Sequence, residues 1–394
     1  MMRLKNSRGL FFDRTKEPRI SYWANPKLVD YVKAAGGRAI PKYLTEWDPC
    51  AEDSRSNCPH LHDMLVNIVE MVHPKWRDRA RNIFAGRTFS DIDTATANRN
   101  LRGGMISMSE NFTQVIYAYA SMQGTFIYSV DLGKNMTDSE VEAMWQGMRS
   151  DFDEAIALYR AGGLLAMKGS LPMVSPSEEF RRAAESLASA AESWILAHEL
   201  GHHLARDMSS RKDQDVVKVL REVTTNSLIA EKLRTMSEDQ RCEVEADLLA
   251  TLILCGHFVP EEHSKNLIET AIGGAGIALV SVAHFRDEWT ADPSDSHPGC
   301  LERLWIIAVV MSELYGTIGV DENDPARAHI TVFRLAALIM TFGSWVHNVE
   351  TMLQAADVTR QQTGRRYPVA AVTFAKYAAW FGILAEDAES LREG

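Results

Sequence analysis

The sequence lacks the features that mark a secreted or nucleic-acid-binding protein. Only five of its 394 residues are cysteine, an odd number that does not suit a disulfide framework. Basic residues are in the minority, with 42 Lys and Arg against 53 Asp and Glu, so the formal net charge is -11. Duplex nucleic acid and anionic membrane surfaces both need a positively charged protein surface. We therefore expect neither of them as the main partner.

Long hydrophobic runs are also lacking. The most apolar stretches are residues 270–283, 304–311 and 330–346, and the last of these contains Arg334. A membrane span needs about 20 apolar residues with few charges, so we expect buried helices and no membrane span. The first residues hold a single short apolar run, residues 10–12, which predicts no signal peptide and a location in a reducing cytoplasm.

The composition is that of a globular protein, with 46% hydrophobic and 24% charged residues. Residues 106–109 alternate apolar and polar side chains, which is typical of a strand with one buried face. Most other patterns are helical, so we predict a mostly α (α+β) fold with one small sheet. Helical patterns are expected at residues 131–157, 301–316, 326–357 and 369–392. We divide the chain into an N-terminal accessory region (1–85), a core (86–315) and a C-terminal helical region packed on that core (316–394).

One long helix is predicted most clearly. A capping box with proline at the first helical position occupies residues 175–178. A buried stripe at spacings of four and three follows it, made of Phe180, Ala184, Leu187, Ala191 and Trp194. Four and eight residues further on, the same stripe reaches His198 and His202. A core-facing stripe that changes from apolar side chains to imidazoles indicates a site rather than simple packing.

The motif His-Glu-x-x-His at residues 198–202 predicts a metal site. Because His198 and His202 lie one helical turn apart on one face, both imidazoles can reach a single ion. Glu199 lies about 100° around the helix. From there it can contact a water molecule on the metal without being a ligand itself.

A second helix supplies the carboxylates. Residues 237–240 form a capping box, and the helix runs from there to about residue 255. Glu243 and Asp247 share one face of it, so Glu243 is the expected third ligand and Asp247 can orient a ligand histidine from the outer layer. Glu245 is the competing ligand, although its spacing directs it away from that face. Two histidines and one carboxylate leave a position open for water, as in catalytic zinc sites.

These two motifs together resemble the gluzincin zinc metallopeptidases. Within them, the sequence is most similar to the group that holds the CAAX prenyl proteases and the HtpX and Oma-type peptidases. Residues 296–304 resemble the Ser/Thr-His-Pro…Arg segment of that group. The resemblance implies a zincin-like core with a small edge sheet. It also implies that His297 lines the cleft and steadies the oxyanion, and that Arg303 holds its segment in place.

The resemblance also implies a substrate and a place for it to bind. In that group an edge strand ahead of the metal helix pairs with the extended substrate, and residues 105–109 are the candidate here. The other interpretation of this stretch is a buried strand without substrate contact. The membrane helices of that group are not evident, so a soluble relative similar to the ImmA/IrrE-type or phage-exclusion peptidases, which cut one regulatory or host protein, is an equally plausible interpretation.

The sequence therefore predicts a zinc-dependent endopeptidase with a protein or peptide substrate. Zinc is the expected cofactor, held by His198, His202 and Glu243, and Glu199 is the expected general base. Two other hypotheses remain. One is a metal-stabilised regulatory or binding module that does not cleave, and the other is a helical scaffold in which the motif is a coincidence.

Overall fold

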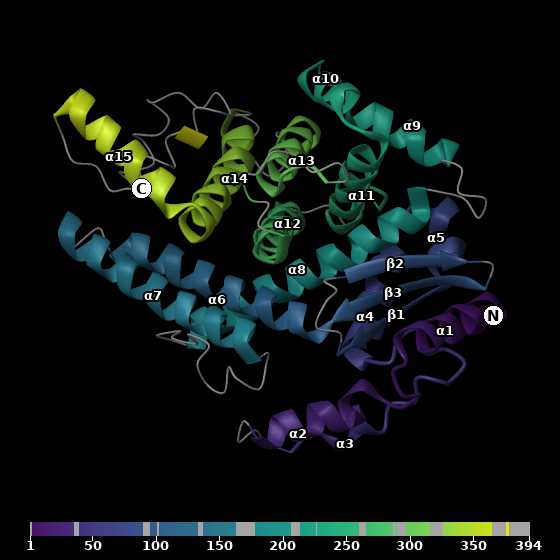
Figure 1. Ribbon diagram of the computed structural model, residues 1–394. Coiled ribbons are helices and arrows are strands. Elements are labelled where there is room, and N and C mark those ends of the chain that lie inside the picture. The colour runs from purple at the N-terminus through teal and green to yellow at the C-terminus, as the bar shows by residue number, and fades with distance from the viewer. Residues whose placement is uncertain are drawn as a thin grey trace.

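The structure combines many helices with one small sheet (Figure 1). The computed structural model describes residues 2–34, 39–89, 95–100, 102–132, 137–162, 178–205, 213–225, 227–259, 265–286, 289, 297–315, 326–364 and 376–377. Across these residues helices predominate, and the sheet has three strands. The expected class, mostly α (α+β), is confirmed.

The sheet has its last strand in the middle. Its strands are β1 (Ile83–Thr88), β2 (Ala95–Asn100) and β3 (Gly103–Ser109), in the order β1-β3-β2. Strand β3 runs parallel to β1 and antiparallel to β2. The predicted strand is thus present, and the alternation of its side chains sends Ile106 and Met108 into the main core and Met105 towards a smaller one.

The N-terminal segments cover one face and one edge of this sheet. Helix α1 (Met2–Thr15) packs Phe11 and Phe12 against Phe84 of β1. Along the outer edge of β1, Ser56 forms a parallel bridge with Ala85. The short elements of this region are η1 (Tyr22–Ala24), α2 (Pro26–Ala34), α3 (Lys42–Thr45), α4 (Pro59–Met71) and α5 (Pro74–Ala80). The β1 edge is therefore already occupied by the chain itself.

The remaining helices form layers on the other side of the sheet, with α8 between the sheet and the rest (Figure 1). Helix α6 (Glu110–Leu132) follows β3 directly. The others are α7 (Asp138–Gly162), α8 (Glu178–Ala205), α9 (Gln214–Val223), α10 (Ser227–Thr235), α11 (Glu238–Leu254), α12 (Lys265–Arg286), α13 (Cys300–Tyr315), α14 (Ala326–His347) and α15 (Val349–Thr363).

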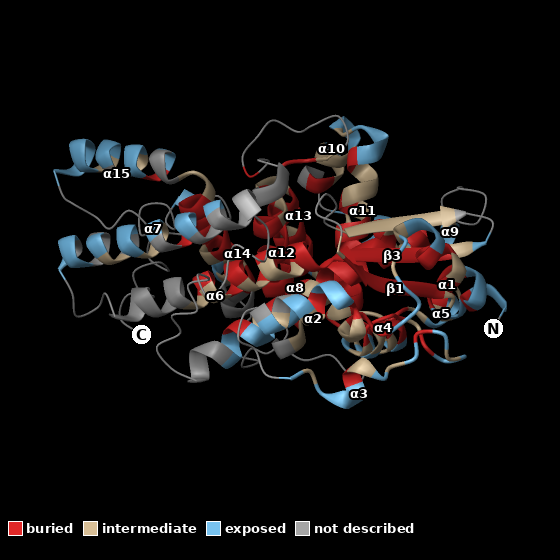
Figure 2. Ribbon diagram, turned by 60° about the horizontal axis from the view of Figure 1, so that its bottom comes forward, coloured by how far each residue is buried: buried red, intermediate tan, exposed pale blue. Residues whose placement is uncertain are grey.

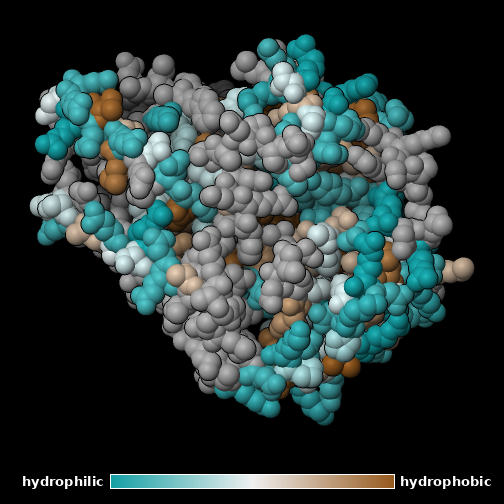
Figure 3. Space-filling view, viewed as in Figure 1, coloured by the Kyte–Doolittle hydropathy of each residue, from teal (hydrophilic) through white to brown (hydrophobic). Residues whose placement is uncertain are grey.

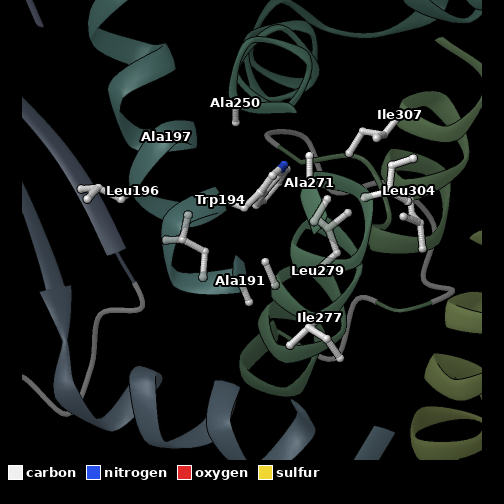
Figure 4. Packing of buried hydrophobic residues seen from close by; sticks show 14 of the residues in the cluster. Ala191, Trp194, Leu196, Ala197, Ala250, Ala271, Ile277, Leu279, Leu304 and Ile307 are labelled. Atoms are coloured by element: carbon white, nitrogen blue, oxygen red, sulfur yellow. The ribbon is translucent and has the colours of Figure 1, made fainter. Parts of the chain in front are cut away.

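The apolar stripe of α8 packs on α11 and α12, as Figure 4 shows around Trp194. Trp194 is buried and donates from its indole nitrogen to Thr251 Oγ1 of α11 at 2.9 Å. Helix α12 approaches very closely, because a Cβ at Gly274 would lie only 2.6 Å from the carbonyl oxygen of Ala190. Figure 2 shows the resulting buried core along α8, α12 and α13, and largely exposed ends at α7 and α15.

Two predicted helix limits were wrong. The acidic helix begins at Asp138 rather than at residue 131, because residues 131 and 132 still belong to α6. The pattern at 326–357 is two helices, since Asn348 leaves the helical conformation with a φ of -148°. The capping box at 175–178 falls mostly outside the described residues, and so does most of the helix expected at 369–392. The three-region division of the chain stays a prediction.

Two features of the described residues bear on membrane contact, the lengths of the helices and the hydropathy of the surface. In the described ranges, no one helix has the length and apolarity to cross a membrane, although α14 and α15 pass that test as a sharply bent pair. Among the coloured residues, Figure 3 shows mostly hydrophilic atoms with small separate hydrophobic areas. The exposed large hydrophobic side chains among the described residues are Met2, Ile20 and Tyr43, together with Leu353 and Val358 of α15.

Candidate metal centre

The two motifs lie on helices that touch each other, α8 and α11. Gly201 of α8 faces Ala246 of α11, and a Cβ at Gly201 would lie 3.1 Å from the Ala246 carbonyl oxygen. The predicted capping box begins α11, with Ser237 Oγ accepting from the Gln240 amide at 3.2 Å. Small residues at this crossing let the two motifs face each other at short range.

The predicted ligand atoms converge. The Nε2 atoms of His198 and His202 are 3.1 Å apart. Glu243 places one oxygen 3.4 Å from His202 Nε2 and the other 3.6 Å from His198 Nε2. Among the described residues, these three form the group that could hold a metal ion, and Glu245 is not in it. The structure thus brings together the three residues that the sequence singled out as ligands.

Two further charged residues, Asp247 and Arg303, contact the predicted ligands. Asp247 Oδ1 lies 2.9 Å from His198 Nδ1, which leaves Nε2 of that ring directed at the group. Arg303, from α13, donates to both oxygens of Asp247 at 2.6 and 2.7 Å. Its guanidinium also lies 3.6 Å from Glu243. Arg303 therefore does more than hold its own segment, because it connects both carboxylates of α11.

Burial and neighbouring charges set the protonation states of this group. Burial raises the pKa of Asp247, but the Arg303 guanidinium more than offsets this and keeps the pKa below its usual value. Burial lowers the pKa of His202 to about 3, with a contribution from the charge on His198. For His198 burial acts in the same direction, but the hydrogen bonds with Asp247 and Glu243 prevail and raise its pKa to about 10. These shifts favour ionised carboxylates at Glu243 and Asp247 and a neutral His202.

The group opens into a cavity of about 420 Å³. Glu199 lines it and is only 8% exposed. His297 also lines it, with its Nε2 3.7 Å from Glu243 Oε1. The rest of the lining is mainly apolar: Ala95, Ala97, Phe112, Trp194, Ile195, Leu279 and Val282, with Thr96, Cys242 and Arg303. Each predicted site residue therefore lies at this cavity except Asp247, which lies behind it.

The prediction that residues 105–109 form the edge strand that pairs with the substrate was wrong. Residues 105–109 belong to β3, which has β1 on one side and β2 on the other, so no edge of it is free. The other interpretation, a buried strand, is confirmed. The strand at the cavity is β2, whose Ala95, Thr96 and Ala97 line it. Its sequence, Ala-Thr-Ala-Asn-Arg-Asn, contains only two apolar residues, both small alanines, and this is why pattern analysis missed it.

His203 follows the candidate ligand His202 in the chain but is not part of the ligand group. It is 2% exposed and points away from the ligand group, with its Nε2 3.1 Å from the carbonyl oxygen of Met105 in β3. The lack of a side chain at Gly104 makes room for this ring. Nothing in the local pattern predicted this contact, because it depends on where the sheet lies relative to α8.

Comparisons with known proteins agree with a proteolytic function. Residues 136–312 match the model of a family described as Peptidase U49. The matched segment contains both motif helices and the segment with His297 and Arg303. Searches of curated proteins and of solved structures returned no match. The family match supports a peptidase, which is a hydrolase that acts on a protein substrate.

Proposed function

We propose that this protein is a zinc-dependent endopeptidase whose zinc is held by His198, His202 and Glu243. The observation that carries the proposal is the spacing of the three donor groups. Two ligand atoms at 2.0–2.1 Å from a tetrahedral ion lie about 3.3 Å from each other. The Nε2 atoms of His198 and His202 are 3.1 Å apart, and Glu243 has one oxygen 3.4 Å from His202 Nε2 and its other oxygen 3.6 Å from His198 Nε2. The donor set and its spacing fit zinc.

The surroundings of the group support a catalytic rather than a structural ion. A structural zinc site is closed by four protein ligands, whereas a catalytic site keeps one position for water. Among the described residues, three candidate ligands are grouped here, and they line a cavity. Asp247 at His198 Nδ1 is the kind of outer partner that fixes the orientation of a ligand imidazole.

Each residue at the cavity has a proposed task. When bound, zinc lowers the pKa of a water molecule to about 7 and polarises the scissile carbonyl. Glu199 takes the proton of the attacking water and passes it to the leaving amine. His297 donates a hydrogen bond to the oxygen that becomes negatively charged, a role worth about 3–4 kcal/mol in other hydrolases. Arg303 and Asp247 hold the ligands in place.

We further propose that the substrate adds to the β2 edge of the sheet. The opposite edge, β1, already has residues 55–57 along it: Ser56 bridges Ala85, and the Asn57 side chain pairs with the backbone of Arg87 at 2.8 and 2.9 Å. The β2 edge lines the cavity instead. An extended peptide there would gain backbone hydrogen bonds and reach the ligand group with its scissile bond.

The variant Glu199→Gln tests the mechanism. It removes the base while keeping the size of the side chain, so the chain should retain about one zinc per molecule and lose nearly all cleavage. Zinc is measured by atomic emission on purified protein. Cleavage is measured by mass spectrometry of new protein termini in cells that express the parent or the variant.

The outcomes separate the proposal from its alternatives. Equal new termini with the parent and the variant would remove Glu199 from the mechanism. Bound zinc without any new termini for the parent would favour a metal-stabilised module that does not cleave. A parent without zinc would favour a helical scaffold.

The five free cysteines support our proposal that the protein works in a reducing compartment such as the cytoplasm.

A further inference from the structure

The C-terminal end of α8 is attached to the sheet by two side chains that the proposed hydrolysis does not use. One is His203, which follows the ligand His202 in the chain. The other is Arg99 of β2. Their contacts connect the metal helix to the strand at the cavity.

His203 provides the first connection. Its Nε2 lies 3.1 Å from the Met105 carbonyl oxygen, and its ring lies over Gly104, where a Cβ would meet the ring at 3.0 Å. Arg99 Nε donates to His203 Nδ1 at 3.4 Å. Because Nδ1 is the acceptor, the ring hydrogen is on Nε2, and His203 donates it to the Met105 carbonyl. The ring is thereby held as one neutral tautomer between β3 and Arg99.

Arg99 provides the second connection. It lies opposite Gly104 in the β2–β3 ladder, directly beside the His203 ring. Its guanidinium also donates to the backbone carbonyl of His203, a carbonyl in the last turn of α8. A cation is favourable at this end of a helix. Only one peptide unit separates the ligand His202 from the carbonyl that Arg99 holds.

The alternation of side chains along β2 places Arg99 on the same face of the strand as two alanines that line the cavity. Ala95, Ala97 and Arg99 share one face of the strand, and both alanines line the cavity. The opposite face makes different contacts: Thr96 Oγ1 lies 2.7 Å from Ser107 Oγ, and Asn98 accepts from Arg14. Arg99 therefore joins the strand to α8, and Arg14 joins the same strand to α1.

From this geometry we propose that Arg99 is a positioning residue, which holds the substrate-pairing strand β2 at a fixed distance from the metal ligands of α8. The proposal rests on the proposed function, because the position of β2 affects catalysis only if substrate pairs with it. Removing Arg99 should weaken the binding of an extended peptide and leave the binding of a small metal ligand unchanged.

The experiment compares two hydroxamates on the zinc-loaded full chain. Acetohydroxamate probes the metal alone, and tetraalanine hydroxamate probes the metal and the strand together. Dissociation constants are measured by calorimetry for the parent, Arg99→Ala, Arg99→Lys and the control Arg14→Ala. Zinc content is measured for all four.

We expect Arg99→Ala to bind tetraalanine hydroxamate about tenfold more weakly than the parent, because the strand is no longer preorganised. Its zinc content and its affinity for acetohydroxamate should equal those of the parent. Arg99→Lys should also lose affinity for the peptide probe, since an ammonium lacks the planar fork that reaches both the ring and the carbonyl. Arg14→Ala should bind both probes as the parent does.

Several results would overturn the proposal. One is unchanged binding of the peptide probe by Arg99→Ala, or by Arg99→Lys where the alanine variant does not fold. Another is an equal loss for both probes or a loss of zinc, which would make Arg99 a support of the metal site. A parent that holds zinc and binds acetohydroxamate but gains nothing from the peptide would refute pairing with β2. A parent that binds neither zinc nor acetohydroxamate would instead refute the proposed function.

Discussion

Two buried clusters on opposite sides of α8 have the same ingredients, one arginine and two carboxylates. The cleft cluster is Arg303 with Asp247 and Glu243. The sheet cluster is Arg87 of β1 with Glu192 of α8 at 2.8 Å and Glu110 of α6 at 3.5 Å. In both, burial alone would lower the pKa of the arginine, but the carboxylates prevail and raise it.

The difference between the clusters lies in their neighbours. The cleft cluster has two imidazoles within reach of Glu243 and opens into the cavity. The sheet cluster has Thr113 and a backbone-bound asparagine around Arg87, and none of its three members lines that cavity. A buried arginine with two carboxylates is therefore not by itself a sign of a site. Imidazoles at ligand spacing and access to a cavity are what make one cluster a candidate metal centre.

The largest expected effect comes from breaking the sheet cluster. Arg87→Met leaves Glu110 and Glu192 buried without their cation, and such a loss costs about 3–5 kcal/mol of unfolding free energy. Zinc content should not change, because the cluster is not at the ligands. Urea unfolding and zinc analysis check both points. As a control, Arg81→Met removes a surface arginine that is 43% exposed beside Glu70, and it should change stability by about 0–1 kcal/mol.

The next largest expected effect is on zinc affinity, compared after the loss of one carboxylate from each cluster. Glu243→Gln removes the negative charge of the proposed ligand and should weaken zinc binding by about 100-fold or more, since even outer-layer changes cost about 10–100-fold. Glu192→Gln makes the same chemical change in the sheet cluster and should leave zinc affinity unaltered. Competition with a chelator measures both. If the two variants bound zinc equally well, Glu243 would not be a ligand.

The smallest expected effect is on stability, and it tests how closely α8 and α11 must pack. Gly201→Ala places a methyl group 3.1 Å from the Ala246 carbonyl oxygen, and we expect a loss of about 1–3 kcal/mol in stability from overpacking. Gly124→Ala is the matched control, because no atom lies within 4 Å of its Cβ position in α6. That variant should gain about 1 kcal/mol from helix propensity. Thermal unfolding of both variants checks the sign, and a stabilised Gly201→Ala would contradict a tight crossing.

Much of the candidate site could be predicted because its parts are local. The spacing of four residues places His198 with His202, and Glu243 with Asp247, whatever the rest of the fold does. The capping box at Ser237 was predictable for the same reason, since all its contacts lie within one helical turn. Zinc itself stays a prediction, and the spacing of the donor atoms supports it.

The wrong predictions concern features that depend on contacts between residues far apart in the sequence. Residues 105–109 were recognised as a strand, but their place in the middle of the sheet depends on β1 and on β2, a strand whose only apolar residues are two alanines. The double role of Arg303 likewise depends on α13 crossing α11, 56 residues away in sequence from Asp247. Helix 326–357 was predicted as one because its apolar pattern continues across Asn348, where the backbone turns.

By itself, the amino-acid sequence determined which residues are paired on each helix and which of them carry metal-binding chemistry, because a helix has a constant geometry. The tertiary structure alone decided that the two pairs meet, that Arg303 connects their carboxylates, and that β2 rather than β3 borders the cavity. The physical reason is that these outcomes depend on close packing between segments far apart in the chain, such as Gly201 on Ala246 and His203 on Gly104.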